Sequence, residues 1–307
     1  MTYNEHRSRA ATAFVIAALL VLVAGGFARA SEPSAKSAPR RASASAAATS
    51  AVPKPSIEEA QAGVKKAPKD PNAYLALGGA YRRAGRPQDA AEAFKKMVSL
   101  QPSNALAHVS LGAAYMDMKR TEEALREFEK ALKLNPSDPS VHFNLGNYYL
   151  TKGRRDDALG EFKKATELKP PLADAFVSYA LIQAELGNTD NATKSYQHAL
   201  EIDSTNVRAL TNLGNAEYSL GKIPDATALY RKALRYDPQN QEANYNLGVA
   251  FADAQIYKEA LHYWKRVVAI DSTTNVAESA KSSIQVLEDF LKSQGTPAPA
   301  PQPSGTN

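Results

Sequence analysis

The sequence predicts an all-α protein in which helical hairpins stack side by side into a solenoid. The main observation is a 34-residue period: a small residue, an alanine twelve residues later and an aromatic residue four further on recur six times. Periods of this length are typical of arrays whose units bury their apolar faces against one another. The small residues are Gly78, Gly112, Gly146, Ala180, Gly214 and Gly248, the alanines Ala90, Ala124, Ala158, Ala192, Ala226 and Ala260, and the aromatics Phe94, Phe128, Phe162, Tyr196, Tyr230 and Trp264.

Two further observations divide each period into two helices. In the first unit, apolar residues follow helical spacing on both sides of the polar stretch "RRAGRPQ". Glycine ends the first helix, since it adopts a left-handed conformation without steric cost. Proline ends the second, because it lacks a donor N–H and disfavours helix in the residue before it. The apolar residues are Tyr74, Leu77, Tyr81, Ala90, Phe94 and Met97, the glycines Gly85, Gly153, Gly187 and Gly221, and the prolines Pro102, Pro136, Pro170 and Pro238.

The first 30 residues predict an export segment. Arg7 and Arg9 precede residues 10–27, which contain no charge, and Ala28-Arg29-Ala30 offers a signal-peptidase site. We favour cleavage, because the many alanines lower the membrane affinity of the apolar run. The alternative is a retained membrane anchor formed by residues 10–27. In either case we expect the remainder to be exported, as a periplasmic or extracellular protein.

The segments that flank the repeats predict a linker, two end helices and a tail. Residues 31–55 and 294–307 are rich in alanine, serine and proline, so we expect a disordered linker and a disordered tail. Residues 56–69 have the pattern of the second helix of a half unit, and residues 275–293 that of a capping helix. Repeat arrays need such caps, because an uncovered terminal unit exposes its apolar face.

The repeat pattern resembles the tetratricopeptide repeat (TPR) family. The resemblance covers residues 71–274 and implies a right-handed α-solenoid with a concave groove, lined by the first helix of each unit, that binds protein or peptide partners. Departures are Ala180 for glycine, Lys119 and Gln255 at the turn glycine, and Ser204 and Ser272 at the proline. The six units are 71–104, 105–138, 139–172, 173–206, 207–240 and 241–274.

A stripe of apolar residues with interleaved amides predicts the binding surface. It consists of the fifth, ninth and twelfth residues of each unit, next to the core face of the first helix. Aromatic and aliphatic groups there would bury peptide side chains, while asparagine pairs with a peptide backbone. Alternatively, the asparagines bond a neighbouring backbone. The predicted groove adds Arg208 and the asparagines at the sixth position to residues of this stripe, and consists of Phe143, Asn144, Asn147, Leu150, Val177, Leu181, Arg208, Thr211, Asn212, Asn215, Tyr218, Tyr245, Asn246 and Val249.

Several classes of function are not expected. The chain has no cysteine, so it forms no disulfide and has no thiol chemistry. It also contains none of the common hydrolase, protease or dinucleotide motifs, and we predict no enzyme, catalytic residue, cofactor or metal site. His108 and His142 are 34 residues apart, at the same position of adjacent units, which suggests a pair of metal ligands. We favour the alternative that both pack at the edge of the core. A net charge of +5 is too small to predict nucleic-acid binding.

The leading functional prediction is an exported scaffold whose groove binds a peptide or helix of a partner protein. The alternative is an obligate accessory subunit or assembly factor of an envelope complex, for polysaccharide export, pilus formation or outer-membrane biogenesis. The two differ in whether the partner stays bound. The sequence does not predict the oligomeric state.

Overall fold

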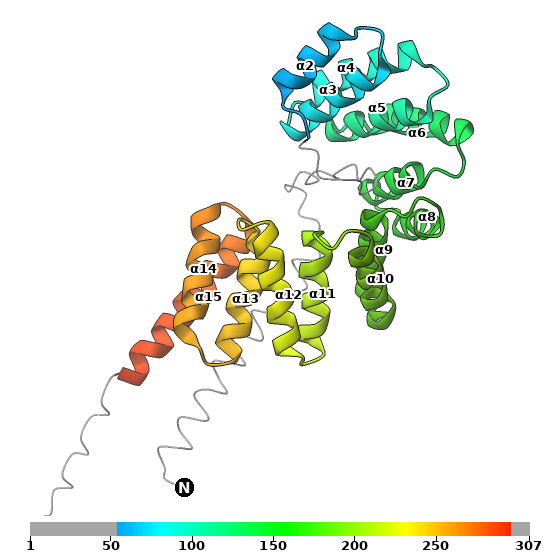
Figure 1. Ribbon diagram of the computed structural model, residues 1–307. Helices are drawn as coiled ribbons and strands as arrows, with labels where there is room; N and C mark the ends of the chain where they lie inside the picture. Colours follow the sequence, from blue (N-terminus) through cyan, green and yellow to red (C-terminus); the bar gives the residue numbers. More distant parts are fainter. Residues whose placement is uncertain (1–53, 296–307) are drawn as a thin grey trace, which may run out of the picture. The chain divides into compact units, whose positions relative to one another are not determined.

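The computed structural model describes residues 54–295, which form fourteen α-helices. The predicted export segment, residues 31–53 of the linker and residues 296–307 of the tail lie outside the described residues. Figure 1 shows the helices in chain order. They are α2 (Ile57–Lys66), α3 (Pro71–Arg83), α4 (Pro87–Leu100), α5 (Ala105–Asp117), α6 (Thr121–Leu134), α7 (Pro139–Thr151), α8 (Arg155–Glu167), α9 (Ala173–Glu185), α10 (Thr189–Ile202), α11 (Val207–Ser219), α12 (Ile223–Tyr236), α13 (Gln241–Asp253), α14 (Tyr257–Ile270) and α15 (Asn275–Gly295).

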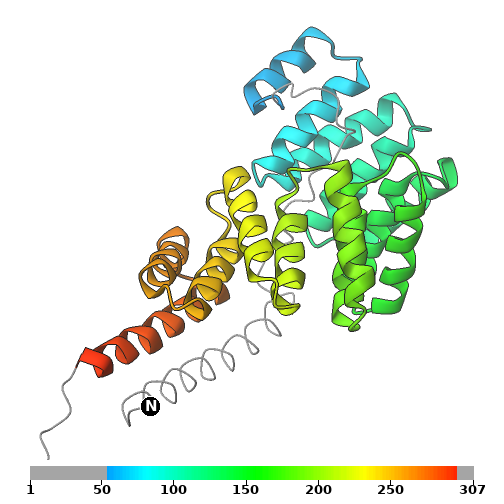
Figure 2. The same cartoon turned by 60° about the horizontal axis from the view of Figure 1, so that its bottom comes forward.

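The predicted all-helical stack of repeats is confirmed. Each repeat contributes one helical hairpin, and the pairs α3 with α4, α5 with α6, α7 with α8, α9 with α10, and α13 with α14 pack closely. Figures 1 and 2 show the two helices of these hairpins side by side from two directions. Helix α2 packs on α3, and α15 packs on α14, so one additional helix lies at each end of the described chain.

Close helix contact explains the recurring glycine and aromatic residue. A Cβ atom added at Gly78 would lie 2.3 Å from Phe94, and one at Gly112 would lie 2.5 Å from Phe128. Gly146, Gly214 and Gly248 stand against the aromatic ring of their own hairpin in the same way. No side chain fits at these positions, because the ring occupies the space that it would need.

The turn inside each hairpin is closed by a repeated backbone hydrogen bond. The N–H that precedes the second helix donates to a carbonyl near the end of the first, as from Arg86 to Tyr81 at 2.9 Å. One residue of the turn then adopts a positive φ. That residue is Gly85, Gly153, Gly187 or Gly221 in four hairpins, and it is Lys119 or Gln255, with φ of 60° and 62°, in the other two.

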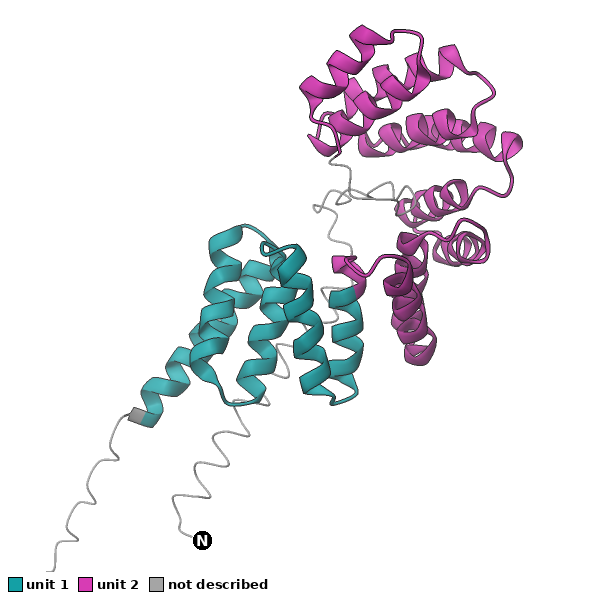
Figure 3. Ribbon diagram, viewed as in Figure 1, with its two compact units in different colours: residues 1–33, 210–307 teal, residues 34–209 magenta. Residues whose placement is uncertain are grey.

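The described residues divide into two compact units, coloured separately in Figure 3. The N-terminal unit comprises residues 54–209 and the C-terminal unit comprises residues 210–295, so the division falls within α11. Each unit has its own core. The largest fully buried side chains of the N-terminal unit are Met97, Phe128, Val141, Phe162 and Val177, and those of the C-terminal unit are Leu210, Tyr230, Leu247, Trp264, Val267 and Leu287.

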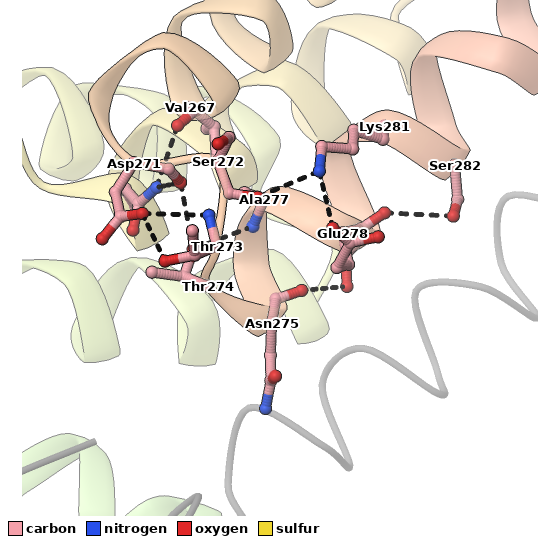
Figure 4. Close-up of polar contacts among 12 residues, drawn as sticks. Val267, Asp271, Ser272, Thr273, Thr274, Asn275, Ala277, Glu278, Lys281 and Ser282 are labelled. Atoms are coloured by element: carbon pink, nitrogen blue, oxygen red, sulfur yellow. Dashed lines mark hydrogen bonds and ion pairs between the residues drawn. The ribbon is translucent and has the colours of Figure 1, made fainter. Parts of the chain in front are cut away.

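A network of polar contacts joins α14 to the final helix, as Figure 4 shows. The Thr274 hydroxyl accepts a hydrogen bond from the Ala277 N–H at 3.1 Å and thereby caps the start of α15. Lys281 donates to the Ser272 carbonyl at 2.9 Å and pairs with Glu278 at 2.6 Å. These contacts hold the loop between the two helices, and α15 covers the apolar side of α14.

Candidate peptide-binding surface

In the N-terminal unit, two residues of the predicted stripe belong to the core. Phe143 on α7 is only 5% exposed, and its ring centroid lies 5.9 Å from that of Phe162. Val177 on α9 is fully buried. Phe143 packs in one cluster with Ala175 and Ile182 of the next first helix, α9. Phe143 and Val177 therefore stabilise the stack instead of forming the binding surface.

The remaining predicted residues of the N-terminal unit lie at the surface. Leu150 is 42% exposed, and Asn147 and Leu181 are half-buried. The Asn144 side chain donates from Nδ2 to the Ser140 carbonyl of its own helix at 2.7 Å. Asn144 therefore follows the alternative interpretation, in which asparagine bonds a neighbouring backbone.

In the C-terminal unit, a three-residue hydrogen-bond network holds two of the predicted asparagines together. Asn215 Oδ1 accepts from Asn246 Nδ2 at 2.7 Å and from the Tyr230 hydroxyl at 2.9 Å. Burial raises the pKa of Tyr230, so its hydroxyl remains a donor. Because Asn215 Oδ1 accepts both bonds, the orientation of its amide is fixed.

This network leaves one donor and one acceptor unused. Neither Asn215 Nδ2 nor Asn246 Oδ1 has a hydrogen-bond partner within residues 54–295; Asn215 is half-buried, and Asn246 is 8% exposed. The two groups come from adjacent first helices, α11 and α13. They are the hydrogen-bonding groups of this pair that a peptide backbone would use, since neither is engaged within the described protein.

Other predicted residues border this pair. Tyr218 is half-buried, and its hydroxyl donates to the Asp253 carboxylate. Burial and the Asp253 carboxylate both raise the pKa of Tyr218, so it stays neutral. Tyr245 is 7% exposed, and its carbonyl accepts from the Trp264 indole at 3.1 Å. Tyr245 thus contributes mainly to packing.

The last four predicted residues are in different environments. Thr211 and Val249 are buried, with 2% and 3% exposure. Asn212 is half-buried, and Arg208 is exposed. Arg208 belongs to the N-terminal unit and the other three to the C-terminal unit. In the C-terminal unit, α11 carries Thr211 and Asn212 and α13 carries Val249, so these residues share the two helices of the asparagine pair.

Sequence reasoning missed Tyr230 and Asp253, which orient the predicted residues of the C-terminal unit. In the N-terminal unit it missed a similar tie, in which Arg82 donates to Asp117 of the next repeat at 2.6 Å. Tyr230 belongs to the core pattern of the second helix, so its hydroxyl gave no separate signal. Asp117 and Asp253 each end a first helix, and they are 136 residues, or four periods, apart. This shared position in the repeat is the signal in the sequence that could have indicated both contacts.

The two histidines considered as a metal pair are each bound within their own repeat. His108 contacts Glu127 through Nδ1 at 2.6 Å and the Pro102 carbonyl through Nε2 at 2.9 Å. His142 makes the same two contacts in the next repeat, with Glu161 at 2.7 Å and Pro136 at 2.9 Å. Both ring nitrogens thus contact protein oxygen atoms, as expected for packing at the core edge.

Residues 54–295 contain no cluster of three or more His, Asp or Glu side chains arranged to hold a metal ion. Nor is any helix between Lys54 and Gly295 both long and apolar enough to cross a membrane. Residues 10–27 lie outside the described residues.

Family models match most of the helical array. A TPR repeat model matches residues 114–153, 180–218 and 214–255, and two tetratricopeptide repeat models match residues 56–105 and 139–172. A search of curated proteins gave no match.

Two of the solved structures that resemble this chain, those with a TM-score above 0.5, show the same fold. The APC/C hetero-tetramer Cut9-Hcn1 has a TM-score of 0.63 and 15% identity, over 76% of this chain and 45% of that chain. Pseudomonas aeruginosa pilF has a TM-score of 0.58 and 19% identity, over 69% and 96%. YrrB, described as a TPR protein with an unusual peptide-binding site, has a TM-score of 0.47 and 24% identity, over 62% and 99%. The chain belongs to the tetratricopeptide repeat family of protein interaction scaffolds, which are typically non-catalytic.

Proposed function

We propose that this chain is an exported, non-catalytic scaffold that holds an extended peptide segment of an envelope protein. The observation that carries the proposal is the pair Asn215 and Asn246, which are joined at 2.7 Å and keep one donor and one acceptor free. An extended peptide offers a carbonyl and an N–H along each edge. Recognition of these groups gives affinity that depends little on the peptide sequence.

Neighbouring side chains supply the apolar part of the surface. Tyr218 is half-buried on α11 with its hydroxyl held by Asp253, so its ring is fixed in place. A rigid aromatic ring beside fixed amides costs little conformational entropy when a ligand binds. We therefore expect specificity for an apolar or aromatic peptide side chain next to the bonded peptide group.

A change at Asn215 tests binding without removing the network. In Asn215→Asp, the retained oxygen still accepts from Asn246 and Tyr230, but the free Nδ2 donor is replaced by a second oxygen. Asn144→Ala is the matched control, because Asn144 bonds only the backbone of its own helix. Residues 31–307 of each variant, which keep every described helix, would be used to capture partners from envelope extract, followed by titration with peptides of the captured protein.

We expect Asn215→Asp to lose at least about tenfold in affinity, since one hydrogen bond to a peptide carbonyl is replaced by repulsion between two oxygen atoms. Asn144→Ala should bind normally. Equal binding by all three proteins would contradict the assignment of the pair to the peptide site.

Export is tested separately through residues 10–27. Leu20→Arg places a charge in the middle of the apolar run, which opposes insertion into a membrane. We expect the unchanged protein to be recovered from the envelope fraction and the variant from the cytoplasm. The N-terminal residue of the recovered protein distinguishes a cleaved signal from a retained anchor. Recovery of the unchanged protein from the cytoplasm would contradict export.

A further inference from the structure

The second helices of the C-terminal unit carry an excess of positive charge. Helices α12 and α14 contain six lysine or arginine residues and two carboxylates, Asp225 and Glu259. The other helices that lie wholly in this unit have the opposite balance, since α13 has two carboxylates and no cation, and α15 has three carboxylates and two cations. The positive charge is therefore gathered on one pair of helices.

Five of these six lysine and arginine residues form one face, here called the α12–α14 face. Arg231 and Arg235 are four residues apart on α12, and Lys258, Lys265 and Arg266 are spaced by seven and one on α14, so each set lies on one side of its helix. All five side chains are exposed.

An aromatic pair links the two helices, because Phe251 of α13 contacts both Arg231 of α12 and Tyr263 of α14. The Phe251 and Tyr263 rings are stacked, with centroids 5.6 Å apart and an angle of 11° between planes. The Arg231 guanidinium lies 5.6 Å from the Phe251 ring, and Arg266 donates to the Pro238 carbonyl, which follows α12, at 3.1 Å. Both rings are half-buried, so part of each aromatic surface remains accessible.

Most of these cations are not neutralised by a neighbouring carboxylate. Within residues 54–295, Lys265 pairs with Glu288 at 2.9 Å, whereas Arg231, Arg235 and Lys258 have no ion-pair partner. The second helices of the N-terminal unit differ: α4, α6, α8 and α10 together carry nine cations and twelve carboxylates. The positive face is thus a local feature of the C-terminal unit and not a property of the repeat.

We propose that the α12–α14 face docks on an anionic phospholipid surface. A broad face with cations on two helices and partly exposed aromatic rings between them suits a flat, negatively charged partner. Each lysine or arginine near such a surface gains attraction, and aromatic rings favour the headgroup region. This inference does not depend on the peptide-binding proposal, which concerns the asparagine pair of α11 and α13.

The test compares vesicle binding of residues 31–307 with that of two charge variants. One carries Arg231→Gln, Arg235→Gln and Lys258→Gln on the α12–α14 face. The matched control carries Lys96→Gln, Arg126→Gln and Lys133→Gln on α4 and α6, which removes the same formal charge from exposed residues of the N-terminal unit. Circular dichroism confirms that both remain helical, and flotation measures binding to vesicles.

We expect the unchanged protein and the control to bind equimolar phosphatidylglycerol and phosphatidylcholine vesicles and not phosphatidylcholine alone. The face variant should bind on the order of 100-fold more weakly, as expected for the loss of three cations at such a surface. Binding of the unchanged protein should weaken as salt is raised. Equal loss in both variants, or no binding by the unchanged protein, would overturn the proposal.

A further probe separates lipid from acidic protein. If the unchanged protein binds polyglutamate but not anionic vesicles, and the face variant loses that binding, the partner of this face is an acidic polypeptide and the lipid proposal is wrong. Peptide capture through Asn215 should be the same in the face variant and the unchanged protein. A parallel loss of both activities would show that the two surfaces are not independent.

Discussion

The first three hairpins, all in the N-terminal unit, and the three that follow, which include both hairpins of the C-terminal unit, use the same backbone turn but fill it with different side chains. In three hairpins of the N-terminal unit, an arginine at the start of the second helix stacks on a tyrosine of the first, with distances of 4.6 to 4.8 Å between guanidinium and ring. From the fourth hairpin onward the pair changes, while the backbone bond between the two residues remains. The pairs are Tyr81 with Arg86, Tyr115 with Arg120, Tyr149 with Arg154, Gln183 with Asn188, Glu217 with Lys222, and Phe251 with Ile256.

This comparison shows which contacts define the hairpin and which are free to vary. The backbone hydrogen bond and the contact between the small residue and the aromatic ring hold the two helices together. The side-chain pair at the turn only has to be compatible, by cation–π contact, by amide hydrogen bonding or by charge. The C-terminal unit thereby replaces Tyr and Arg with residues such as Phe251, which takes part in the α12–α14 face.

The largest expected effect comes from removing the aromatic ring in either unit. Phe128→Ala and Trp264→Ala each delete a fully buried side chain, and each should lower the free energy of unfolding by about 3 to 5 kcal/mol. Trp264→Ala also removes the bond to the Tyr245 carbonyl. Hydrogen exchange should show faster exchange mainly in the unit that carries the change. Equal loss of protection in both units would contradict the division into two cores.

Adjacent glycines on α3 should respond in opposite directions to the same substitution. A Cβ at Gly78 would lie 2.3 Å from Phe94, so Gly78→Ala should destabilise the protein by about 1 to 3 kcal/mol. At Gly79 the nearest atom would be Arg83 Nη1 at 3.5 Å, so Gly79→Ala should stabilise by up to about 1 kcal/mol through helix propensity. Urea denaturation measures both, and the same sign for both would contradict the packing described.

Acid should weaken the N-terminal unit more than the C-terminal unit. Burial disfavours the charged form of Glu127, but hydrogen bonds from Lys130 and His108 outweigh it and lower its pKa; the same balance with Lys164 and His142 lowers the pKa of Glu161. A carboxylate whose pKa is lower in the folded than in the unfolded protein stabilises the fold at pH values above the unfolded pKa. This stabilisation is lost as the pH falls through the folded pKa.

The corresponding residues of the C-terminal unit are Leu229 and Tyr263, so this unit has no carboxylate at the position. We expect the acid dependence of unfolding, followed by hydrogen exchange below about pH 4.5, to appear first in residues 54–209. Glu127→Gln with Glu161→Gln should reduce it. An unchanged acid dependence in this double variant would contradict the role of the two carboxylates.

The turn residues with positive φ offer a smaller test. Lys119 has a φ of 60°. This backbone conformation is less favourable for a residue with a Cβ atom than for glycine. Lys119→Gly should raise stability by about 0.5 to 1 kcal/mol, whereas Gly153→Ala should lower it by a similar amount. Thermal melting of both variants checks this prediction. Destabilisation by Lys119→Gly would show that the lysine side chain makes a contact that stabilises the protein by more than the backbone strain destabilises it.

The smallest expected effect compares two turn pairs by double-mutant cycles. Tyr149 with Arg154 should show a coupling of about 0.5 to 1 kcal/mol from the cation–π contact. Glu217 with Lys222, joined at 2.9 Å, should show about 0.2 to 1 kcal/mol. Added salt should reduce the second coupling more than the first, because Lys222 is exposed and salt screens its attraction to Glu217. No coupling in either pair would contradict the role assigned to these side chains.

Much of the fold could be predicted because the period repeats contacts within one hairpin. Gly112 and Phe128 are sixteen residues apart in the sequence and touch in the structure, and five other units repeat the spacing. The stripe of the site was less well predicted. Helical spacing alone does not reveal how closely the next helix covers the stripe, which is why Phe143 is core. The bond from Tyr230 to Asn215 also crosses two helices, and no local pattern indicates it.

The central claim is that the Asn215 and Asn246 pair binds a peptide backbone, and side-chain amide NMR tests it most directly. Residues 31–307 would be labelled and titrated with a peptide from the captured partner. We predict that the Asn215 Nδ2 signals shift and exchange more slowly with solvent on binding, while those of Asn144 stay unchanged. A peptide that binds with equal affinity to Asn215→Asp, or that leaves the Asn215 signals unperturbed, would contradict the claim.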